Sequence, residues 1–506
     1  MLRKIRSVFA LIFFILITVL FLDFTGALHA YLGWMAKVQF LPAVLSLNVA
    51  VILGILLITL LLGRIYCSVI CPLGVLQDGV SHIAGKKKKN RFRFHKERKV
   101  LRYTVLGILI LSIIFGLGSL TALLAPYSAY GRIVQNLFSP VWQGINNLLA
   151  LFAERADSYA FYTKEVWIRS LPTFIIATVT LIAVVVLSWK GGREYCNSFC
   201  PVGTFLSLFA RHSWFKIHID ENACVNCGLC SKNCKSSCID IEHHSIDYSR
   251  CVVCGDCIDK CRKGAISYSH LPIKNSKTGT GTTTSTKPAD GKQATAADSG
   301  RRAFLIGTAL ATGQLAFSQE KKKVDGGLAV IEKKKAPHRT TPITPAGSLS
   351  ARNMATHCTG CQLCVSACPN DVLRPSTELD KLMQPTVSYE KGYCRPECNR
   401  CSQICPAGAI RPISLEDKSS TQVGHAVWIR ENCISITDGV SCGNCARHCP
   451  AGAISMVRLN PDDPQSLRIP SVNPARCIGC GACENLCPSR PYSAIYVEGH
   501  EVHKTI

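Results

Sequence analysis

Residues 224–234 read Cys-Val-Asn-Cys-Gly-Leu-Cys-Ser-Lys-Asn-Cys, and residues 251–261 repeat the spacing as Cys-Val-Val-Cys-Gly-Asp-Cys-Ile-Asp-Lys-Cys. Three cysteines separated by two residues, with a fourth after three more, present thiolates at the spacing that binds a 4Fe-4S cluster. In a chain with two such motifs, the fourth thiolate reaches the neighbouring cluster. We therefore predict one cluster on Cys224, Cys227, Cys230 and Cys261, and a second on Cys251, Cys254, Cys257 and Cys234.

The same two motifs favour iron over zinc. A structural zinc site needs only pairs of cysteines, so it does not account for a complete triplet-plus-one motif that occurs twice. Residues 218–270 are therefore predicted to form an α+β module like a bacterial ferredoxin. Two features depart from the common pattern. Lys235 and Arg262 stand where proline often follows the fourth cysteine, and Cys238 is an additional thiol that could replace Cys234 as a ligand.

Residues 351–506 contain four more cysteine quartets, each of which ends in Cys-Pro. The second and third have three and eight residues between their first two cysteines, and the other two have the regular spacing. Spacing does not decide which quartets exchange ligands. Ile410, Ile454 and Ile495 follow motifs and suit short strands. We predict a four-cluster ferredoxin domain, and six 4Fe-4S clusters in all. Its ligands are Cys358, Cys361, Cys364, Cys368, Cys394, Cys398, Cys401, Cys405, Cys433, Cys442, Cys445, Cys449, Cys477, Cys480, Cys483 and Cys487.

The N-terminal part, residues 1–217, is predicted to be a membrane domain. Its uncharged stretches are near or above the roughly 20 residues that cross a bilayer, which indicates four helical spans. Lys and Arg crowd residues 86–99, between the second and third stretches, so both ends of the four-span unit are expected in the cytoplasm. Residues 218–270 then lie in the cytoplasm too. The stretches are residues 7–22, 38–63, 103–130 and 170–189.

An internal repeat follows two of these stretches. Residues 63–74 read Gly-Arg-Ile-Tyr-Cys-Ser-Val-Ile-Cys-Pro-Leu-Gly, and residues 192–203 read Gly-Arg-Glu-Tyr-Cys-Asn-Ser-Phe-Cys-Pro-Val-Gly, which agree at seven of twelve positions. A parallel repeat brings Cys67, Cys71, Cys196 and Cys200 together at the cytoplasmic side. They are candidates for a further metal centre of four thiolates or for two redox-active dithiols near a quinone. Buried small side chains are the alternative.

Between the two cysteine-rich modules, residues 271–300 have the composition of a flexible linker. Arg301-Arg302-Ala303-Phe304-Leu305 and the weakly apolar residues up to 319 are similar to a twin-arginine export signal. An interfacial segment is the alternative. Iron–sulfur clusters are inserted inside the cell, so a domain that contains them must be exported in folded form. The basic linker at 320–350 opposes its crossing of the membrane. Residues 301–319 are thus expected to be a cleaved signal or a fifth span, with residues 351–506 outside the cytoplasm.

Charge and cysteine counts agree with this organisation. Among 506 residues, 57 Lys and Arg stand against 33 Asp and Glu, a net charge of +24. The densest basic run flanks a predicted span and has no aromatic stacking module, so no nucleic-acid partner is predicted. Of the 29 cysteines, 24 fall into the six quartets and four into the repeat, which leaves only Cys238. The predicted fold class is an α-helical membrane domain with α+β ferredoxin-like modules.

These clusters pass single electrons, and no residues for bond-making catalysis are found. No covalent-haem motif occurs, the spans contain no histidine pairs, and the Gly279-Thr280-Gly281 stretch lies in a linker, so NAD(P)H is not the expected donor. Quinol from the membrane pool is the expected donor.

The chain resembles a fusion of two known subunits. The four spans with Cys67-x3-Cys71-Pro72 and Cys196-x3-Cys200-Pro201, and the two-cluster tail, resemble the membrane subunit of the quinol dehydrogenase that serves periplasmic nitrate reductase. Residues 301–506 resemble its exported ferredoxin-type partner. The resemblance implies a multi-pass protein of a bacterial inner membrane that oxidises quinol in anaerobic respiration. Electrons would reach a periplasmic reductase or cytochrome. The fusion is a departure that leaves cleavage after 301–319 open.

Two other functions are compatible with the same residues. The membrane cysteines could reduce or carry copper during assembly of an oxidase. Alternatively, the C-terminal module could remain in the cytoplasm and form an electron relay fed by soluble ferredoxin.

Overall fold

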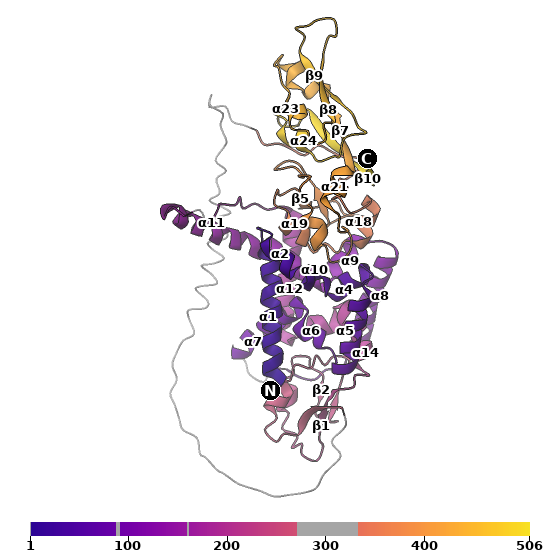
Figure 1. Ribbon diagram of the computed structural model, residues 1–506. Coiled ribbons are helices and arrows are strands. Elements are labelled where there is room, and N and C mark those ends of the chain that lie inside the picture. The colour runs from indigo at the N-terminus through magenta and orange to yellow at the C-terminus, as the bar shows by residue number, and fades with distance from the viewer. Residues whose placement is uncertain (1, 88–91, 159–160, 271–331) are drawn as a thin grey trace. The chain divides into compact units, whose positions relative to one another are not determined.

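The computed structural model describes residues 2–87, 92–158, 161–270 and 332–506 (Figure 1). The predicted linker at 271–300, the twin-arginine segment at 301–319 and the first part of the basic linker lie outside the described residues. The chain divides into two compact units. All cysteines belong to the larger unit. That unit consists of Met1–Ser139, Ile168–Tyr268 and Glu332–Ile506, and the smaller one of Pro140–Trp167 and Ser269–Ile331.

Two helices in the described part of the chain are long and apolar enough to cross a membrane, α1 (Leu2–Leu22) and α12 (Leu171–Gly191). They coincide with the first and fourth predicted spans. The remaining helices of the N-terminal part are α2 (Ala27–Leu32), α3 (Trp34–Lys37), α4 (Phe40–Leu45), α5 (Val49–Leu62), α6 (Ile65–Val69), α7 (Pro72–Lys87), α8 (Lys99–Ile114), α9 (Gly118–Leu124), α10 (Pro126–Ile133), the π-helix η1 (Val134–Phe138), α11 (Ser139–Arg155), α13 (Glu194–Ser198) and α14 (Pro201–Ala210).

The second and third predicted spans are not continuous helices. The stretch 38–63 divides into α4 and α5, because Leu47 takes a positive φ and the Asn48 side chain caps α5 by accepting from the Val51 amide. The stretch 103–130 divides at Gly116, whose φ is 69°, and again at Pro126. The 14 residues of α5 measure about 21 Å, less than the roughly 30 Å hydrocarbon core of a bilayer. The structure therefore supplies two of the four spans as single long helices.

The two repeat copies take the same local form. Each copy has a short helix, α6 or α13, that carries the first cysteine of its pair, followed by a helix that begins at Pro72 or Pro201. Proline suits the first helical turn because its missing amide hydrogen has no intrahelical partner there. Helices α6 and α7 pack against α1, and α14 packs against α5 and α8. The repeat thus lies inside the helical part of the larger unit.

The cysteine-rich parts contain short helices and two-stranded sheets, which is the predicted α+β form. The paired strands are β1 (Lys216–Ile219) with β4 (Ile266–Ser269), β2 (Ile239–Asp240) with β3 (Ser245–Ile246), β5 (Leu373–Pro375) with β6 (Pro385–Val387), β7 (Thr421–Trp428) with β10 (Ile495–Thr505), and β8 (Ile454–Arg458) with β9 (Arg468–Val472). The helices are α15 (Leu229–Lys232), α16 (Asp256–Lys260), α18 (Ala351–His357), α19 (Leu363–Ala367), α20 (Arg400–Ile404), α21 (Leu415–Ser420), the 3-10 helix η2 (Arg430–Asn432), α22 (Ile434–Thr437), α23 (Asn444–Arg447) and α24 (Ala482–Leu486).

Two of the three strand predictions are confirmed. Ile454 begins β8 and Ile495 begins β10, whereas Ile410 lies in a bend and not in a strand. The Ile410 side chain is nevertheless buried in the core, and the next amide, that of Arg411, donates to the Gly347 carbonyl. An apolar residue after a cysteine motif therefore identifies a buried position more reliably than a strand.

Candidate iron–sulfur sites

Each of the four regularly spaced quartets has the same unusual backbone. The second and fourth residues after its first cysteine both adopt positive φ. Such turns point successive amide groups into one concavity, a form of anion-binding site. Several of these positions are not glycine, so the loops hold conformations that ordinary side chains rarely adopt. The residues are Asn226 and Gly228, Val253 and Gly255, Gly360 and Gln362, and Gly479 and Gly481. An anionic cluster with four thiolates fits these loops.

The 218–270 module contains a cavity lined by thiols. Cys234 lines it together with Cys251, Cys254 and Cys257, and so does the additional thiol of Cys238. The Cys238 Sγ lies 3.5 Å from the Cys234 Sγ. The rest of the lining includes Ile217, Ile239, Ile246 and Val252. The structure thus brings the fourth cysteine of the first motif to the first three of the second, with a fifth thiol in the same cavity.

In the C-terminal module, the first two quartets interleave. Burial raises the pKa of the Cys364 thiol well above its usual value, and so do the neighbouring Cys358, Cys361 and Cys405 thiols. Burial likewise raises the pKa of Cys401, followed by its neighbours Cys394 and Cys368. The fourth cysteine of each quartet therefore lies with the first three of the other. The two groups of thiols are Cys358, Cys361, Cys364 and Cys405, and Cys368, Cys394, Cys398 and Cys401.

The third and fourth quartets interleave in the same way. Burial raises the pKa of the Cys445 thiol to about 11, and Cys442 and Cys487 raise it as well. Burial raises the pKa of Cys480 to about 12, with Cys477 and Cys449 acting in the same direction. Cys433 belongs to the same buried cluster of side chains as Cys487. These neighbours group Cys442 and Cys445 with Cys487, and Cys477 and Cys480 with Cys449. By analogy with the first two quartets, Cys433 completes the former group and Cys483 the latter.

The repeat brings its four thiols together, and all four are buried. Burial raises the pKa of the Cys200 thiol well above its usual value, and the Cys196, Cys71 and Cys67 thiols raise it further. The Gln77 amide donates to the Cys196 Sγ at 3.1 Å, and the Gly203 amide donates to the Cys200 Sγ at 3.4 Å. The thiols thus face one another and already accept hydrogen bonds.

The four repeat thiols are spread too widely for one mononuclear metal ion. Among the described residues, no three of them have sulfur atoms that all lie within 4.8 Å of one another. Four thiolates around a single ion at about 2.3 Å stand closer to one another than that. The described thiols are therefore not arranged as a compact site for one copper or zinc ion.

One arginine from each repeat copy is fully buried beside these thiols. Arg193 is bound by the carboxylate of Asp78, from its Nε to Oδ1 at 2.9 Å and from its Nη2 to Oδ2 at 2.8 Å. Burial alone would raise the pKa of Asp78, but Arg193, Lys235 and Arg6 lower it well below its usual range. Arg64 instead donates to the Asn197 side chain and the Ser249 carbonyl. Within the residues that the structure describes, Arg193 has a carboxylate partner and Arg64 has none.

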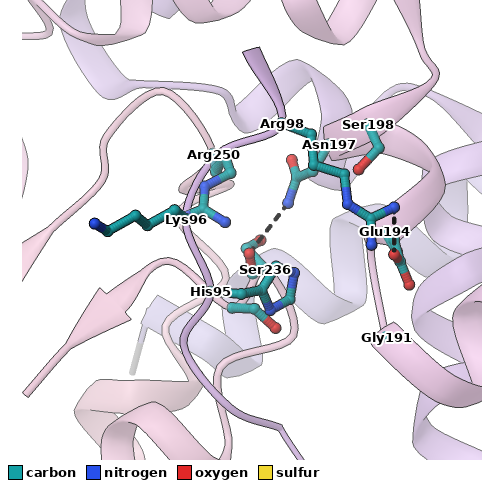
Figure 2. Close-up of a pocket in the computed structure, with 10 residues that line it drawn as sticks. His95, Lys96, Arg98, Gly191, Glu194, Asn197, Ser198, Ser236 and Arg250 are labelled. Atoms are coloured by element: carbon teal, nitrogen blue, oxygen red, sulfur yellow. Dashed lines mark hydrogen bonds and ion pairs between the residues drawn. The ribbon is translucent and has the colours of Figure 1, made fainter. Parts of the chain in front are cut away.

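A polar pocket lies between the repeat and the 218–270 module (Figure 2). Its two arginines are already engaged: Arg98 pairs with Glu194 at 3.5 Å, and Arg250 pairs with Asp247 at 2.6 Å. The Asn197 side chain donates to the Ser236 carbonyl across it. The pocket lies where the two parts meet, and both of its arginines already have carboxylate partners.

The C-terminal module packs on α9 and α10 through the loop of its first quartet (Figure 1). A Cβ on Gly131 of α10 would lie 2.4 Å from the Cys361 carbonyl oxygen, so this loop rests directly on helix backbone. The Asn136 amide donates to the Gln362 side chain at 2.9 Å. Farther along the module, the Cys394 amide donates to the Cys480 carbonyl at 3.0 Å. The four thiol groups therefore follow one another through the module, beginning at α10.

Sequence reasoning missed the polar residues around the repeat thiols. Arg64 and Arg193 occupy matching positions within the repeated segment, and that identity was a signal for them. Gln77 and Asp78 have no such signal, since the aligned residues of the second copy are Leu206 and Ser207.

Comparison with known proteins supports the cluster modules. A family model described as a 4Fe-4S binding domain matches residues 46–91 and 173–220, which include both repeat copies. A 4Fe-4S dicluster model matches residues 357–409, which contain the first two quartets, and residues 440–490, which contain the fourth quartet and all of the third except Cys433. A third model, also a 4Fe-4S binding domain, matches residues 244–267. No solved structure matches the chain.

Curated relatives are proteins of electron transfer. The chain is 33% identical over 170 residues to the methylamine utilization ferredoxin-type protein MauM of Methylobacillus flagellatus, which covers 32% of this chain and 70% of that protein. It is 28% identical over 188 residues to the ferredoxin-type protein NapG of Escherichia coli, and the match covers 35% of this chain and 81% of that protein. It is 25% identical over 196 residues to the putative electron transport protein YccM of Escherichia coli, and the match covers 39% of this chain and 48% of that protein.

Fold and sites together define an iron–sulfur protein that transfers electrons. The chain belongs to the ferredoxin-type proteins, the family that includes MauM.

Proposed function

We propose that the chain is a membrane-bound protein that oxidises quinol and relays single electrons through 4Fe-4S clusters to an acceptor outside the cytoplasm. The observation that carries this proposal is that the two ends of α1 contact different cluster modules. At its beginning, Arg3 pairs with Asp256 of the 218–270 module at 3.0 Å. Just beyond its end, the Thr25 carbonyl accepts from Arg400 of the C-terminal module at 2.8 Å. The 21 residues of α1 measure about 31 Å, which is the thickness of a bilayer core.

The surface of the helical part supports a membrane location. Large apolar side chains are exposed along α1, α5, α8 and α12, whereas soluble proteins rarely expose large contiguous apolar areas. Examples are Phe9, Leu53, Ile110 and Val179. Lipid contact accounts for these side chains. The proposal includes four membrane crossings, with the short helices α5 and α8 in the second and third.

One packed core joins the thiol groups that such a relay needs. It contains Cys254 of the first module, Cys71 and Cys200 of the repeat, and Cys361 of the C-terminal module. Tyr66 and Tyr127 belong to the same core, between the repeat and the first C-terminal quartet. We propose that the six quartets hold six 4Fe-4S clusters and that the repeat thiols hold a seventh centre that connects the two modules. When bound, these clusters supply one-electron transfer.

Reduction by a quinol tests the function. Purified full-length chain in detergent is mixed anaerobically with a menaquinol or ubiquinol analogue, and the reduced clusters are counted by EPR. We expect reduction by quinol that is lost when Cys67 and Cys196 are both changed to Ser, while dithionite still reduces the six quartet clusters. A chain that dithionite reduces and no quinol reduces would show that the donor is wrong.

The copper-handling function is less well supported. In this alternative the four repeat thiols reduce or carry copper, and among the described residues no three of their sulfur atoms lie within 4.8 Å of one another, as they would in a compact site for a bound ion. Copper binding that disappears with the four cysteines and leaves quinol reactivity intact would favour it over the proposal.

A further inference from the structure

Arg132 of α10 is a fully buried cation whose guanidinium is only partly satisfied. Its Nη1 donates to the Ala122 carbonyl at 2.7 Å. Its Nε and Nη2 are buried and have no hydrogen-bond partner among the described residues. Arginine has five N–H donors and remains charged at any physiological pH. The remaining donors of Arg132 therefore need an acceptor that the described part of the polypeptide does not provide.

No carboxylate neutralises Arg132 in the described part of the chain. The ionisable groups that act on it electrostatically are Tyr195 and Cys361. A buried charge without a counter-charge is strongly destabilising, so native proteins pair such groups or place them against a bound ion. The contrast with Arg193, which has Asp78, indicates that the counter-charge of Arg132 is a bound group.

The residue before Arg132 lies against the loop of the first C-terminal quartet, and Cys361 of this loop acts electrostatically on Arg132. Gly131, the preceding residue, lies so close to the Cys361 carbonyl that no Cβ fits between them. On this loop, Gly360 and Gln362 have the paired positive φ values that form an anion-binding concavity. A 4Fe-4S cluster with four thiolates carries net negative charge, and its sulfur atoms accept hydrogen bonds.

We propose that the Arg132 guanidinium donates hydrogen bonds to the cluster bound by Cys358, Cys361, Cys364 and Cys405, and stabilises its reduced form. Reduction adds one electron and one negative charge to the cluster, while Arg132 keeps its proton throughout. A fixed neighbouring cation favours the more negative state, and charge-assisted hydrogen bonds are stronger than neutral ones. Arg132 is therefore a positioning and tuning residue, and the proposal rests on the cluster of the proposed function.

Because Arg132 belongs to α10 and the cysteines belong to the C-terminal module, the effect depends on docking. A module that is separated from α10 loses the cation, and its first cluster becomes harder to reduce. In the docked chain, Arg132 makes this cluster easier to reduce by electrons from the membrane side than it is in a separated module.

The test is a potentiometric EPR titration of the full-length chain in detergent, with dithionite as reductant so that no quinol is needed. Arg132→Met removes both charge and donors, and Arg132→Lys keeps the charge. We expect Arg132→Met to weaken reduction of one cluster at least tenfold, a shift of about 59 mV for one electron, with the other clusters unchanged. Arg132→Lys should recover part of this shift.

Arg169→Gln is the matched control. Arg169 also belongs to the helical part and also contacts the module, but its partner is the Asp371 carboxylate at 2.9 Å. We expect Arg169→Gln to leave every potential unchanged. Loss of a single cluster from Arg132→Met, with retention in Arg132→Lys and Arg169→Gln, would also support the proposal.

The proposal would be overturned if Arg132→Met kept all its clusters with unchanged reduction potentials. Equal loss of a cluster from Arg132→Met, Arg132→Lys and Arg169→Gln would overturn it as well. Cys361→Ser separates this failure from that of the proposed function. If Cys361→Ser removes no EPR component, the quartet holds no cluster and the proposed function itself is wrong at this site.

Discussion

Arg64 and Arg193, which hold equivalent positions in the two repeat copies, each donate to the main-chain carbonyl of the first cysteine in the other copy. Arg64 bonds to the Cys196 carbonyl at 3.5 Å, and Arg193 bonds to the Cys67 carbonyl. Each arginine therefore holds the main chain of the first cysteine in the other copy, so a substitution in one copy is expected to displace a thiol of the other. The two copies act as one site.

If the repeat thiols hold an iron–sulfur cluster, iron analysis detects it. At four iron atoms per cluster, we expect about 28 iron atoms per chain in the parent protein and about 24 after Cys67→Ser with Cys196→Ser. Cys238→Ser is the control and should leave the count unchanged, unless Cys238 is a ligand in place of Cys234. A parent count of about 24 would exclude the seventh cluster.

Asp78 is expected to be a large contributor to stability. Asp78→Asn leaves the buried Arg193 without its carboxylate, which should lower the free energy of unfolding by about 3–5 kcal/mol. Because the pKa of Asp78 is lowered, its contribution is present above the unfolded pKa of about 3.9 and is lost as the pH falls below it. Thermal unfolding in detergent measures this. Asp259→Asn, at a more exposed ion pair, should cost less than about 1 kcal/mol.

His503 of β10 should make the C-terminal module sensitive to mild acid. Burial, together with the neighbouring His500, lowers its pKa to about 4. A histidine held neutral in the fold stabilises fully above the unfolded pKa of about 6.5 and loses this contribution as the pH falls towards 4. As the pH falls, the free energy of unfolding should therefore decrease by about 1–3 kcal/mol less in His503→Gln than in the parent protein. Urea unfolding of both proteins at pH 7.5 and pH 5 gives the comparison, and equal pH dependence would contradict it.

Gly131→Ala should loosen the docking of the C-terminal module on α10. The new Cβ would lie 2.4 Å from the Cys361 carbonyl and 2.7 Å from the Phe21 ring, an overpacking that typically costs about 1–3 kcal/mol. Faster hydrogen exchange at residues 358–364 is the expected signature. Gly107→Ala in α8 is the control, since its Cβ meets nothing within 4 Å and should stabilise the helix by up to about 1 kcal/mol. Unaltered exchange in Gly131→Ala would indicate that the loop can shift.

The proposed topology can be tested by proteolysis of intact spheroplasts. Residues 459–466 form an exposed turn between β8 and β9 and offer a cleavage site in the C-terminal module. We expect cleavage there from outside the cell, while residues 218–270 stay protected until the membrane is opened. Protection of both modules would place the C-terminal module in the cytoplasm and favour a relay fed by soluble ferredoxin.

Local features of the chain were predictable because they depend on neighbouring residues. Cysteine spacing predicted the six quartets, and Ile454 and Ile495 were correctly expected in strands. Features that depend on distant residues were not. The interleaving of Cys405 with the first quartet requires the module to fold, and an uncharged stretch does not reveal the Asn48 cap that divides the second predicted span.

The candidate sites show the same division. The repeat predicted its four thiols as candidates, whereas its two arginines were missed although their matching positions were a signal for them. Asp78 and Arg132 acquire their roles only through packing. Asp78 binds Arg193 of the second repeat copy. Arg132 follows Gly131, which contacts a loop more than 200 residues away in sequence. A sequence pattern does not carry that information.

The length of α1 has an energetic consequence under the proposed topology. An electron that passes from the module at its beginning to the module at its end crosses the whole transmembrane voltage. Moving one elementary charge across 100 mV is worth about 2.3 kcal/mol. With the cell interior negative, outward transfer is driven by this voltage and inward transfer is opposed by it. The helix that separates the two modules thereby makes the direction of electron flow depend on the energised state of the membrane.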